Sequence, residues 1–494
     1  MRLEDLLGRV PGLRCVPGAP PATVEVVGLT ADSRAVRPGF LFAALPGARL
    51  DGRAFIAQAV ENGAVAVLAP EGTEWPAATP LRPLLAAADP RRALALLAAA
   101  FHGEQPATVV AVTGTNGKTS TVDFLRQLWT LAGRRAASLG TLGLRAEGFP
   151  PTPSLTTPDP VALHETLASL ALSGIRHAAL EASSHGLEQR RLDGLRLAAA
   201  GFSNLTRDHL DYHGSMDAYA AAKLRLFDTL LPAGAAAVAN ADMAPEVLAA
   251  LRDIAARRGL RLHTVGMAGE AIRLLRHTPR PDGQVLEVEA LGQRAEVALA
   301  LPGRFQADNV LLAAGLAIAT GLPAASVLRD LPRLTGVRGR MELAVRLPNG
   351  AAVYVDYAHT PDALERLLSA LRPHTEGRLH VVFGAGGDRD PGKRPLMGAV
   401  AARLADHAIL TDDNPRTEDP AAIRAAVRAG MAAGASGEEI GDRAAAIAAG
   451  LAALGPGDVL AVAGKGHEPG QTIGTVTHPF DDAETVRRLA GALA

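Results

Sequence analysis

The 494 residues of the chain are enough for about three domains of ~150 residues each. Its 50 Lys and Arg residues nearly balance 51 Asp and Glu residues, so the charge does not indicate a nucleic-acid or membrane partner, and the only cysteine, Cys15, excludes an intrachain disulfide and a cysteine-based structural zinc site. The first residues lack the apolar run of a signal peptide, and the longest apolar stretch, Val310–Ala319, is too short to cross a bilayer, so we expect a cytosolic protein.

Residues 1–103 alternate short apolar runs with Gly and Pro turns, a pattern typical of a small α/β domain. We expect strands at Thr23–Val27, Phe40–Leu45 and Ala64–Leu68. The segment from Asp51 to Asn62 between two of these strands is expected to be helical.

Residues 104–332 follow a strand, helix, strand pattern. Ala107–Val112 is β-branched and almost wholly apolar, as a buried parallel strand should be. The helix expected after it carries a stripe of Val122, Leu125, Leu128 and Leu131. Two more strands are expected at 175–180 and 235–239, and a helix at 307–320 closes this part of the chain.

Residues 333–494 alternate again, with helical segments between four apolar runs. The expected strands are Ala352–Val355, Leu379–Phe383, His407–Leu410 and Val459–Ala463. This alternation predicts a Rossmann-like, doubly wound sheet. The fold class is therefore α/β, with three domains at 1–103, 104–332 and 333–494.

The strongest motif lies between the first strand and helix of the central part, where the chain reads TGTNGKTS at 113–120. Gly114 and Gly117 let the backbone curl so that its amides point at phosphate oxygens, and the helix N-terminus attracts the same anion. Lys118 supplies positive charge, and the Thr119 hydroxyl can reach Mg²⁺. The alternative is a glycine-rich turn without a ligand, and the strict pattern would have glycine where this chain has Val112.

A scattered set of polar residues follows the later strands. Glu181 ends the second strand, where a phosphate-loop fold places its metal-binding acid, and the loop 204–214 brings further acids together with His209 and His213. Carboxylate, imidazole and phosphate oxygens together could hold Mg²⁺. A zinc pair of His209 and His213 is the rival, but the Glu of an HExxH motif is missing. By itself the cluster is typical of a solvated loop, and Lys223 of an exposed helical lysine.

Ten motifs in order resemble the Mur ligase family, through nearly the whole chain. They are TGTNGKTS (113–120), LTTP (155–158), EASSHGLEQRR (181–191), NLTRDHLDYHG (204–214), AAKLRLF (221–227), GRMEL (339–343), DYAHTPD (356–362), GGDRDPGKRPLM (386–397), DDNPR (412–416) and GKGHE (464–468). The likeness is greatest to the branch that adds meso-diaminopimelate to a UDP-N-acetylmuramoyl dipeptide in peptidoglycan precursor synthesis. It implies an ATP-dependent, amide-forming, monomeric enzyme of the cytoplasm.

The resemblance also implies roles for individual residues. The N-terminal domain would bind the UDP substrate, the central domain ATP and the C-terminal domain the amino acid. ATP would be bound by Gly114, Thr115, Asn116, Gly117, Lys118, Thr119 and Ser120, with Asp356 and His359. The UDP substrate would be bound by Ser33, Thr156, Thr157, Ser183, Gln189 and Arg191, helped by Ala48–Leu50. Mg²⁺ would be held by Thr119, Glu181, His209 and a carbamylated Lys223. Lys118, Lys223 and His209 are the expected catalytic residues.

Four polar clusters each follow a predicted strand of the C-terminal domain directly, at 356–359, 386–389, 413–416 and 464–468. Ligands in such sheets bind outside the carboxyl ends of the strands, so these loops should converge. The expected amino-acid site consists of Arg389, Asp413, Asn414, Pro415, Arg416, Gly464 and Glu468.

The charges of this site suit an amino acid with two ends of mixed charge, because arginine binds carboxylate and an acid binds ammonium. A second carboxylate on the substrate would engage Arg416, which favours meso-diaminopimelate over lysine. The alternative is that Arg416 only pairs with Glu418 or Asp419 at the surface. A dinucleotide site at 382–389 would need a third glycine where the chain has Arg389.

The expected reaction phosphorylates the γ-carboxylate of the D-glutamyl residue with ATP, and the amine of the amino acid then attacks the acyl phosphate. Lys118 and the metal would stabilise the transferring phosphoryl group electrostatically. Three rivals remain: a folylpolyglutamate-synthetase-like ligase, a phosphate-loop ATPase acting as a motor or switch, and a binding protein without catalysis.

Overall fold

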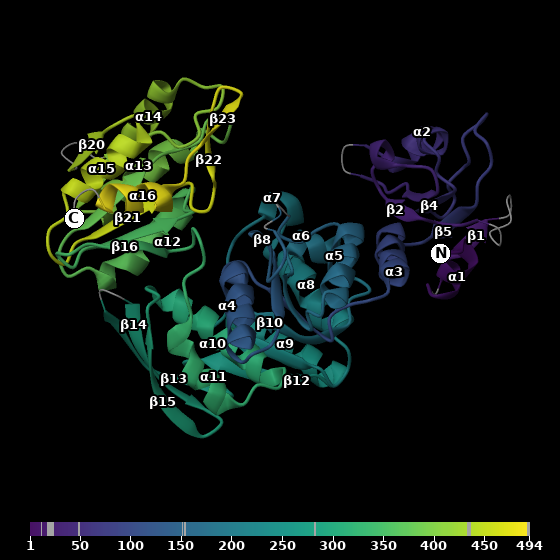
Figure 1. Ribbon diagram of the computed structural model, residues 1–494, viewed down its shortest axis with the longest axis horizontal. Helices are drawn as coiled ribbons and strands as arrows, with labels where there is room; N and C mark the ends of the chain where they lie inside the picture. Colours follow the sequence, from purple (N-terminus) through teal and green to yellow (C-terminus); the bar gives the residue numbers. More distant parts are fainter. Residues whose placement is uncertain are drawn as a thin grey trace. The chain divides into compact units, whose positions relative to one another are not determined.

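The structure is a computed structural model that describes residues 1–10, 12–16, 24–47, 50–150, 152, 155–280, 283–431 and 436–491. The predicted contacts at Ala48 and Arg49 therefore lie outside the described residues. The chain divides into two compact units (Figure 1), which are Met1–His263 with Ala319–Leu322 and Thr264–Ile318 with Pro323–Ala494. The predicted boundaries after residues 103 and 332 stay predictions.

The first unit begins with a five-stranded sheet in the order β1-β5-β4-β3-β2. Its strands are β1 (Arg14–Val16), β2 (Gly28–Thr30), β3 (Phe40–Ala43), β4 (Ala66–Pro70) and β5 (Leu84–Ala87). Its helices are α1 (Leu3–Gly8), the 3-10 turns Ser33–Ala35 and Gly52–Phe55, α2 (Ile56–Glu61) and α3 (Pro90–His102). Alternate strand residues face opposite sides, so that Leu41 packs in the core of α1 and α3 while Phe42 packs in the core of α2.

Two of the three strands predicted in this region are confirmed as β3 and β4, and the predicted helix as the 3-10 turn and α2. The predicted strand at 23–27 is wrong: Thr23 lies outside the described residues, and β2 begins only at Gly28. The amides of Val26 and Val27 donate to Met1 O (2.8 Å) and Gly39 O (2.9 Å). Glu25 thus forms only an isolated antiparallel bridge with Arg2, which is not a strand ladder.

The rest of the first unit contains a mostly parallel sheet in the order β11-β10-β6-β9-β7-β8, in which only β8 is antiparallel. The strands are β6 (Thr108–Thr113), β7 (Ala136–Gly140), β8 (Gly143–Ala146), β9 (His177–Glu181), β10 (Leu197–Phe202) and β11 (Ala236–Asn240). The helices are α4 (Lys118–Leu131), α5 (Pro160–Leu172), α6 (Ser184–Glu188), α7 (Leu210–His213), α8 (Met216–Arg225) and α9 (Pro245–Arg258). The predicted strands are confirmed as β6, β9 and β11. The loops that leave β6, β9 and β10 start from the carboxyl ends of adjacent parallel strands and so meet at one edge of the sheet.

The second unit begins within β12 (Arg261–Gly266), which pairs in parallel with β13 (Ile272–Arg280). The antiparallel strands β14 (Gly283–Ala290) and β15 (Gln293–Leu299) extend β13. This ribbon was not predicted from the sequence. The predicted helix at 307–320 is confirmed as α10 (Arg304–Ala319), and α11 (Ala324–Asp330) and the 3-10 turn Leu331–Arg333 follow it.

The C-terminal part of the second unit is a six-stranded sheet in the order β16-β17-β21-β18-β19-β20, with only β16 antiparallel. The strands are β16 (Glu342–Arg346), β17 (Ala352–Asp356), β18 (Leu379–Phe383), β19 (His407–Leu410), β20 (Gly437–Glu439) and β21 (Val459–Ala463), and the hairpin β22 (Gly470–Ile473) and β23 (Val476–Pro479) stands apart. The helices are α12 (Pro361–Leu371), the 3-10 turn Arg372–His374, α13 (Lys393–Leu404), α14 (Pro420–Arg428), α15 (Arg443–Ala452) and α16 (Asp482–Gly491).

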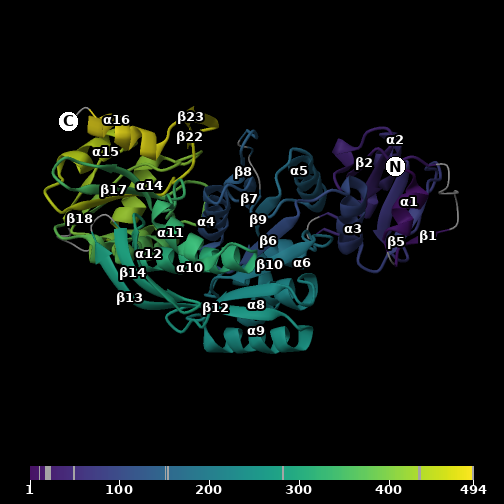
Figure 2. The same ribbon diagram turned by 60° about the horizontal axis from the view of Figure 1, so that its bottom comes forward.

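Helices cover both faces of this sheet (Figure 2). Phe383 of β18 packs in the core formed with α12, α13 and α14, whereas its neighbour Val382 packs in the core formed with α15 and α16. Strands that are buried on both faces are apolar at every position, which is why the sequence predicted β18, β19 and β21 to the residue. The predicted doubly wound sheet is confirmed.

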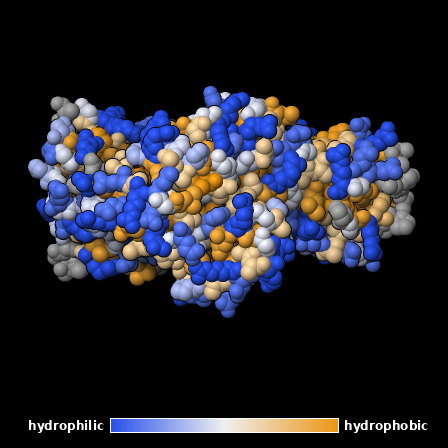
Figure 3. Space-filling model, turned by 90° about the horizontal axis from the view of Figure 1, so that it is seen from below, coloured by the Kyte–Doolittle hydropathy of each residue, from blue (hydrophilic) through white to orange (hydrophobic). Residues whose placement is uncertain are grey.

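Hydrophilic and hydrophobic residues are interspersed on the face shown in Figure 3. Among the helices of the described residues, none combines the length and the apolar character that a membrane span requires.

Candidate functional site

The phosphate loop lies where the sequence predicted it, between β6 and α4. Gly114 and Gly117 adopt φ values of +145° and +86°, which residues with side chains rarely adopt. A Cβ on Gly114 would lie 1.9 Å from Ser203 Oγ, so glycine is also required there by space. The loop leads directly into the first turn of α4, whose amides have no partner within the helix and favour an anion.

The loop that follows β10 braces the phosphate loop. The Thr115 amide donates to Asn204 O (2.8 Å), the Asn116 amide to Asn204 Oδ1 (3.0 Å), and Ser203 Oγ to Asn116 O (2.6 Å). The protein thus already bonds the amides of Thr115 and Asn116. A bound phosphate is therefore left with the amides that begin α4, including those of Thr119 and Ser120.

Two lysine amino groups share one carbonyl of this loop. Lys118 Nζ donates to Gly114 O (2.9 Å) and to Thr115 O (2.9 Å), and Lys223 Nζ also donates to Gly114 O (2.8 Å). Lys223 comes from α8, and only 1% of its surface is exposed, so the expectation from local sequence of an exposed helical lysine is wrong. Desolvation by burial, with the charge of Lys118 as a second cause, lowers the pKa of Lys223 from 10.5 to about 6.

Tyr219 holds Lys223 from one side. The Lys223 amino group lies 4.4 Å from the centre of the Tyr219 ring, and the phenol of Tyr219 donates to Thr115 Oγ1 (3.2 Å). Desolvation raises the pKa of Tyr219 to about 12, so this phenol keeps its proton at neutral pH. Tyr219 was not predicted as a site residue, because an aromatic residue one turn before a lysine is common in any helix.

Glu181 is buried at the end of β9 and has an oriented carboxylate. Its Oε1 accepts from the Thr141 amide (2.8 Å), and its Oε2 accepts from the Thr141 hydroxyl (3.3 Å). A Cβ on Gly140 would lie 2.1 Å from Oε1, so this glycine leaves room for the acid. Carboxylate oxygens are ligands that suit a hard cation.

His209 lines the same region from the loop before α7. It adopts φ of +52°, its imidazole is about half exposed, and its Nε2 lies 3.6 Å from Asp208 Oδ2. His213 is buried, with Nδ1 3.1 Å from Glu188 Oε2. Within the described parts of the chain, no three His, Cys, Asp or Glu side chains form a group that could hold a metal ion. Oxygen atoms such as those of Glu181 and Thr119 are of the kind that Mg²⁺ prefers.

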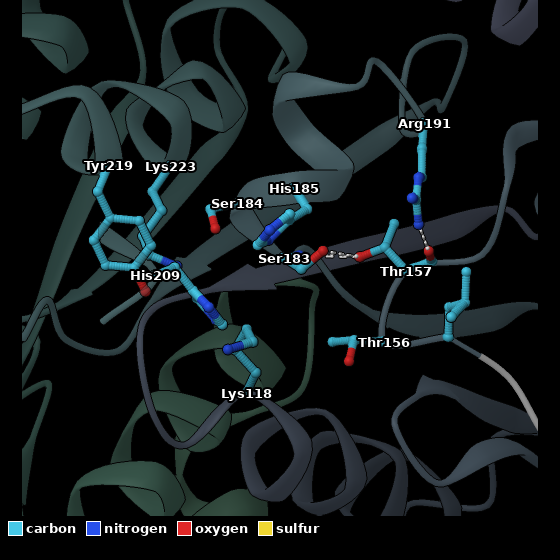
Figure 4. A pocket seen from close by; sticks show the side chains of 11 residues that line it. Lys118, Thr156, Thr157, Ser183, Ser184, His185, Arg191, His209, Tyr219 and Lys223 are labelled. Carbon is cyan, nitrogen blue, oxygen red and sulfur yellow. Dashed lines mark hydrogen bonds between the residues drawn. The ribbon is translucent and has the colours of Figure 1, made fainter. Parts of the chain in front are cut away.

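A pocket of about 340 Å³ joins these groups to residues predicted to hold the UDP substrate (Figure 4). Its lining residues are Lys118, Leu155, Thr156, Thr157, Ser183, Ser184, His185, Arg191, His209, Tyr219 and Lys223. Seven of them were named from the sequence. Leu155, Ser184, His185 and Tyr219 were missed as site residues, and Glu181, Gln189 and Ser33 are not in the lining.

Hydrogen bonds order the wall opposite Lys118. Thr157 Oγ1 donates to Glu181 O (2.8 Å) and lies 3.0 Å from Ser183 Oγ. Arg191 donates from Nη1 to Thr157 O (2.7 Å) and from Nη2 to Gln189 Oε1 (2.7 Å). Gln189 thus orients Arg191 without lining the pocket. Ser33 is buried in the N-terminal sheet region, where its hydroxyl donates to Gln58 Oε1 (3.1 Å).

In the second unit, loops after β18, β19 and β21 converge as predicted. The Gly387 amide donates to Asn414 O (2.9 Å), and Asn414 Nδ2 donates to Glu468 Oε2 (2.9 Å). A Cβ on Gly464 would lie 2.3 Å from Asp413 Oδ2. That oxygen is buried and has no hydrogen-bond partner among the described residues. Buried polar atoms normally have such a partner, so this oxygen suits the binding of a cationic group of a ligand.

Two arginine side chains flank the same backbone position, Arg416 with its guanidinium and Arg389 with its aliphatic stem. A Cβ on Gly386 would lie 2.9 Å from Arg416 Nη1 and 3.9 Å from Arg389 Cγ. Arg416 donates from Nη1 to Gly387 O (2.7 Å), and its own backbone has φ of +51°. Pro415 lies against the neighbouring glycine, because a Cβ on Gly387 would be 1.9 Å from Pro415 O.

The alternative of a surface pair for Arg416 has no support in the described residues. Glu418 instead pairs with Arg394 at 2.8 Å, and Asp419 caps α14 by accepting from the Ala421 amide (3.1 Å). Arg416 instead donates to Gly387 O. The pKa of the Asp388 carboxyl is lowered mainly by hydrogen bonds from Thr417 and further by the nearby charge of Arg416. The predicted role of Arg416 with the amino acid stays a prediction.

Asp356 and His359 follow β17. Asp356 Oδ2 accepts from the Met341 amide (2.7 Å), and burial raises the pKa of Asp356, although the nearby Arg340 guanidinium acts in the opposite direction. His359 Nδ1 lies 2.9 Å from Tyr357 O. Their predicted contacts with ATP stay predictions.

Sequence reasoning missed a buried cation beneath the converging loops. Arg443 pairs with Asp482 at 2.7 Å, with both side chains 0% exposed. It also donates to Ala463 O (3.0 Å) and to Asp412 O (3.5 Å). Arg443 thus ties the backbone before Gly464 to the backbone before Asp413. It begins an alanine-rich helix, so no sequence signal marked it.

Comparisons with known proteins agree with the resemblance seen in the motifs. The chain matches the models described as Mur ligase family catalytic domain at residues 25–102, Mur ligase middle domain at 112–317 and Mur ligase glutamate ligase domain at 339–466. UDP-N-acetylmuramoyl-L-alanyl-D-glutamate–2,6-diaminopimelate ligase of Caulobacter vibrioides is 56% identical and covers 99% of both chains. A solved structure of a ligase with the same name is 36% identical, with a TM-score of 0.74 and 97% of both chains covered. Folylpolyglutamate synthase of Mycobacterium tuberculosis, solved with ADP and AMPPCP, shares the fold at 21% identity, with a TM-score of 0.60 and coverage of 81% of this chain and 95% of that one.

Proposed function

The chain belongs to the Mur ligase family, and from this membership we propose that it is the ATP-dependent ligase that joins meso-diaminopimelate to UDP-N-acetylmuramoyl-L-alanyl-D-glutamate. Its fold is the three-domain α/β fold of Mur ligases. We further propose that it acts as a monomer in the cytoplasm, where peptidoglycan precursors would be built.

One observation carries the proposal: the phosphate-loop lysine and the residues expected to hold the acceptor line one pocket. Lys118 lies in the same lining as Thr157 and Arg191. A kinase-like transfer needs the terminal phosphate and the accepting oxygen within one enclosed space. A motor or switch ATPase has no need of a second polar wall next to its phosphate loop.

In the first step, the γ-carboxylate of the D-glutamyl residue attacks the γ-phosphate of ATP. A P–O bond forms to the carboxylate, the bond to the ADP oxygen breaks, and an acyl phosphate and ADP result. Lys118 leaves the carbonyls of Gly114 and Thr115 and turns to the phosphates, where its charge offsets that of the transferring group. Thr119, Glu181, His209 and a carbamylated Lys223 would hold Mg²⁺, which supplies further positive charge at the phosphate oxygens.

The carbamate on Lys223 is a proposal that its surroundings support. Only a neutral amine adds to CO₂, and burial lowers the pKa of this amine to about 6. Addition of the neutral amine to CO₂, with loss of a proton, would place an anion beside Gly114 where a second ammonium would otherwise lie. An anion next to Lys118 is electrostatically favoured, whereas two ammonium groups on one carbonyl repel each other.

In the second step, the amine of the amino acid attacks the acyl carbon, and phosphate leaves. We propose that Arg416 and Arg389 receive the carboxylate of diaminopimelate that is remote from the reacting amine. Asp413 and Glu468 receive its ammonium group. Asp413 Oδ2, buried without a partner among the described residues, is the atom that gains most from this contact, because burying an unpaired polar group is costly.

The test is product analysis by mass spectrometry. The purified protein is incubated with ATP, Mg²⁺ and the UDP-dipeptide, and separately with meso-diaminopimelate, L-lysine or L-glutamate. We expect ADP and a tripeptide product with meso-diaminopimelate, and neither with the Lys118→Ala variant. ADP release that needs no amino acid would instead indicate a motor or switch, and elongation of a folate by glutamate would indicate the folylpolyglutamate reaction.

A further inference from the structure

Lysine is scarce in this chain, and its placement is selective. Of the 50 Lys and Arg residues only four are lysines. Lys118 and Lys223 line the pocket of the first unit, Lys393 donates to His359 O (2.9 Å), and Lys465 is 0% exposed. A chain that uses arginine almost everywhere retains lysine where a compact ammonium does what a planar guanidinium cannot. Lys465 has not itself been assigned a role, although it lies among groups that have one.

The ammonium of Lys465 closes a ring of polar contacts beneath the converging loops. It donates to Asn414 Oδ1 (3.1 Å) and lies 3.3 Å from Glu468 Oε2. Asn414 Nδ2 donates to the same Glu468 oxygen (2.9 Å). The ring joins the loop after β19 to the loop after β21.

This ring fixes two groups that face the ligand. Asn414 Oδ1 accepts from Lys465 and also from the Thr472 amide (2.9 Å), so the amide of Asn414 cannot turn over without losing two bonds. Lys465 and Asn414 both engage Oε2 of Glu468, and about a third of the Glu468 side chain is exposed. Its Oε1 accepts from the Tyr357 phenol (3.5 Å) and is the oxygen that an incoming ammonium would meet.

We propose that Lys465 is the positioning residue of the amino-acid pocket, which holds the Asn414 amide and the Glu468 carboxylate in the arrangement that receives the ammonium group of the amino acid. The inference rests on the proposed function, since it concerns the second substrate of that reaction. Lys465 acts through Asn414 and Glu468 and does not touch the substrate.

Lys465 also sets the charge of the pocket. Asp413 and Glu468 contribute two negative charges, and Lys465 offsets one of them from below. Without Lys465 the net charge of the pocket becomes more negative by one, and this disfavours an amino acid that brings a second carboxylate. Discrimination between meso-diaminopimelate and L-lysine therefore depends on Lys465 as well as on Arg416.

The experiment compares steady-state kinetics of the full-length wild type and Lys465→Met, varying each of the three substrates in turn. Hydrogen bonds to charged groups are strong enough that we expect the KM for meso-diaminopimelate to rise about ten- to hundredfold. The KM values for ATP and the UDP-dipeptide should stay within about twofold. The ratio of kcat/KM for meso-diaminopimelate over L-lysine should fall. An unchanged KM for meso-diaminopimelate would overturn the inference.

Further variants distinguish a positioning role of Lys465 from a general loss of folded structure. If Lys465 acts through Glu468, the variant Lys465→Met/Glu468→Gln should resemble Glu468→Gln alone, whereas additive effects would contradict that route. Lys465→Arg should also be defective, and wild-type kinetics for it would refute the need for a compact ammonium. Thermal unfolding identifies variants that do not fold, and Lys465→Gln then replaces Lys465→Met, since it keeps a donor without the charge.

The control is Arg403→Met, which removes an exposed pair with Glu365 (2.9 Å) in the same unit and should leave all KM values unchanged. Failure of this inference is distinguishable from failure of the proposed function. A wild type that ligates no diamino acid contradicts the function, whereas a wild type that does so beside an unaffected Lys465→Met contradicts only the role of Lys465.

Discussion

We predict that the amino group of Lys223 loses its proton near pH 6 instead of near 10.5. The cause is its burial, with the charge of Lys118 acting in the same direction. Because the pKa is lowered, the neutral amine is the main form above about pH 6 and is lost below it. At pH 7.5 about 97% of the Lys223 amino groups would be neutral, against about 0.1% for an ordinary lysine.

The scarcity of lysine makes this measurable. Protein labelled with ¹³C at the lysine ε-carbons gives four signals, one for each lysine, and Lys223→Arg identifies the signal of Lys223. In CO₂-free buffer we expect the chemical shift of the Lys223 signal to change with a midpoint near pH 6, whereas an ordinary lysine titrates near pH 10.5. Addition of ¹³C-bicarbonate should then produce a carbamate signal in the wild type that is missing in Lys223→Arg.

A titration of the Lys223 signal above about pH 9 would refute the burial argument. In that case almost no neutral amine would exist at neutral pH, and the proposed carbamate would lose its chemical basis. A normal titration combined with a carbamate signal in the Lys223→Arg variant would assign the modification to another amine.

Three further predictions concern single side chains. Gly114→Ala should lower kcat/KM for ATP at least about hundredfold, because its Cβ would lie 1.9 Å from Ser203 Oγ and its φ of +145° is strained for alanine; ADP release measures this. Arg416→Ala should raise the KM for meso-diaminopimelate about ten- to hundredfold and reduce the preference over L-lysine, as competition between the two amino acids would report. Arg443→Met should lower the free energy of unfolding by about 3–5 kcal/mol, because it leaves the Asp482 carboxylate buried and unpaired; urea unfolding followed by circular dichroism measures the loss.

Each of these predictions has a matched control. Gly148 has φ of +81° and no atom within 4 Å of a built Cβ, so Gly148→Ala should cost some stability and leave ATP kinetics intact. An equal loss of ATP kinetics in both glycine variants would contradict the steric argument. Arg443→Met/Asp482→Leu should recover most of the lost stability, since it removes both charges, and Arg416→Lys should not restore selectivity if two-pronged carboxylate binding is what matters.

Much of the fold could be predicted because burial on both faces leaves a clear pattern. β21 is a continuous apolar run, β18 is apolar except for His380, both are followed directly by glycine, and their predicted limits match the structure. The strand predicted at 23–27 failed because two valines in a row meet the local pattern while their amides bond to separate loops. The ribbon of β13 to β15 was missed because its strands carry mixed polar and apolar residues on faces that only the tertiary structure defines.

The site was predictable where backbone geometry dictates residue type. Gly114 could be found because the turn requires positive φ, and Glu181 could be placed at the end of its strand, although its role at a metal stays a prediction. Tyr219, Arg443 and Lys465 could not be found, since their importance comes from partners far away in the sequence. Local sequence even gave the wrong exposure for Lys223, because a helix face turned toward another loop looks the same as one turned toward water.

The phosphate loop links these local facts into one electrostatic arrangement. Its shape is held by Ser203 and Asn204, so its backbone needs no ligand to form. The loop also has two lysine amino groups at one carbonyl, because Lys118 and Lys223 both donate to Gly114 O. Two ammonium groups at one carbonyl repel each other, and the better buried one gives up its proton first. Burial makes Lys223 the lysine of this pair whose pKa is lowered, and we propose that its amine takes up CO₂ and becomes an anion beside Lys118.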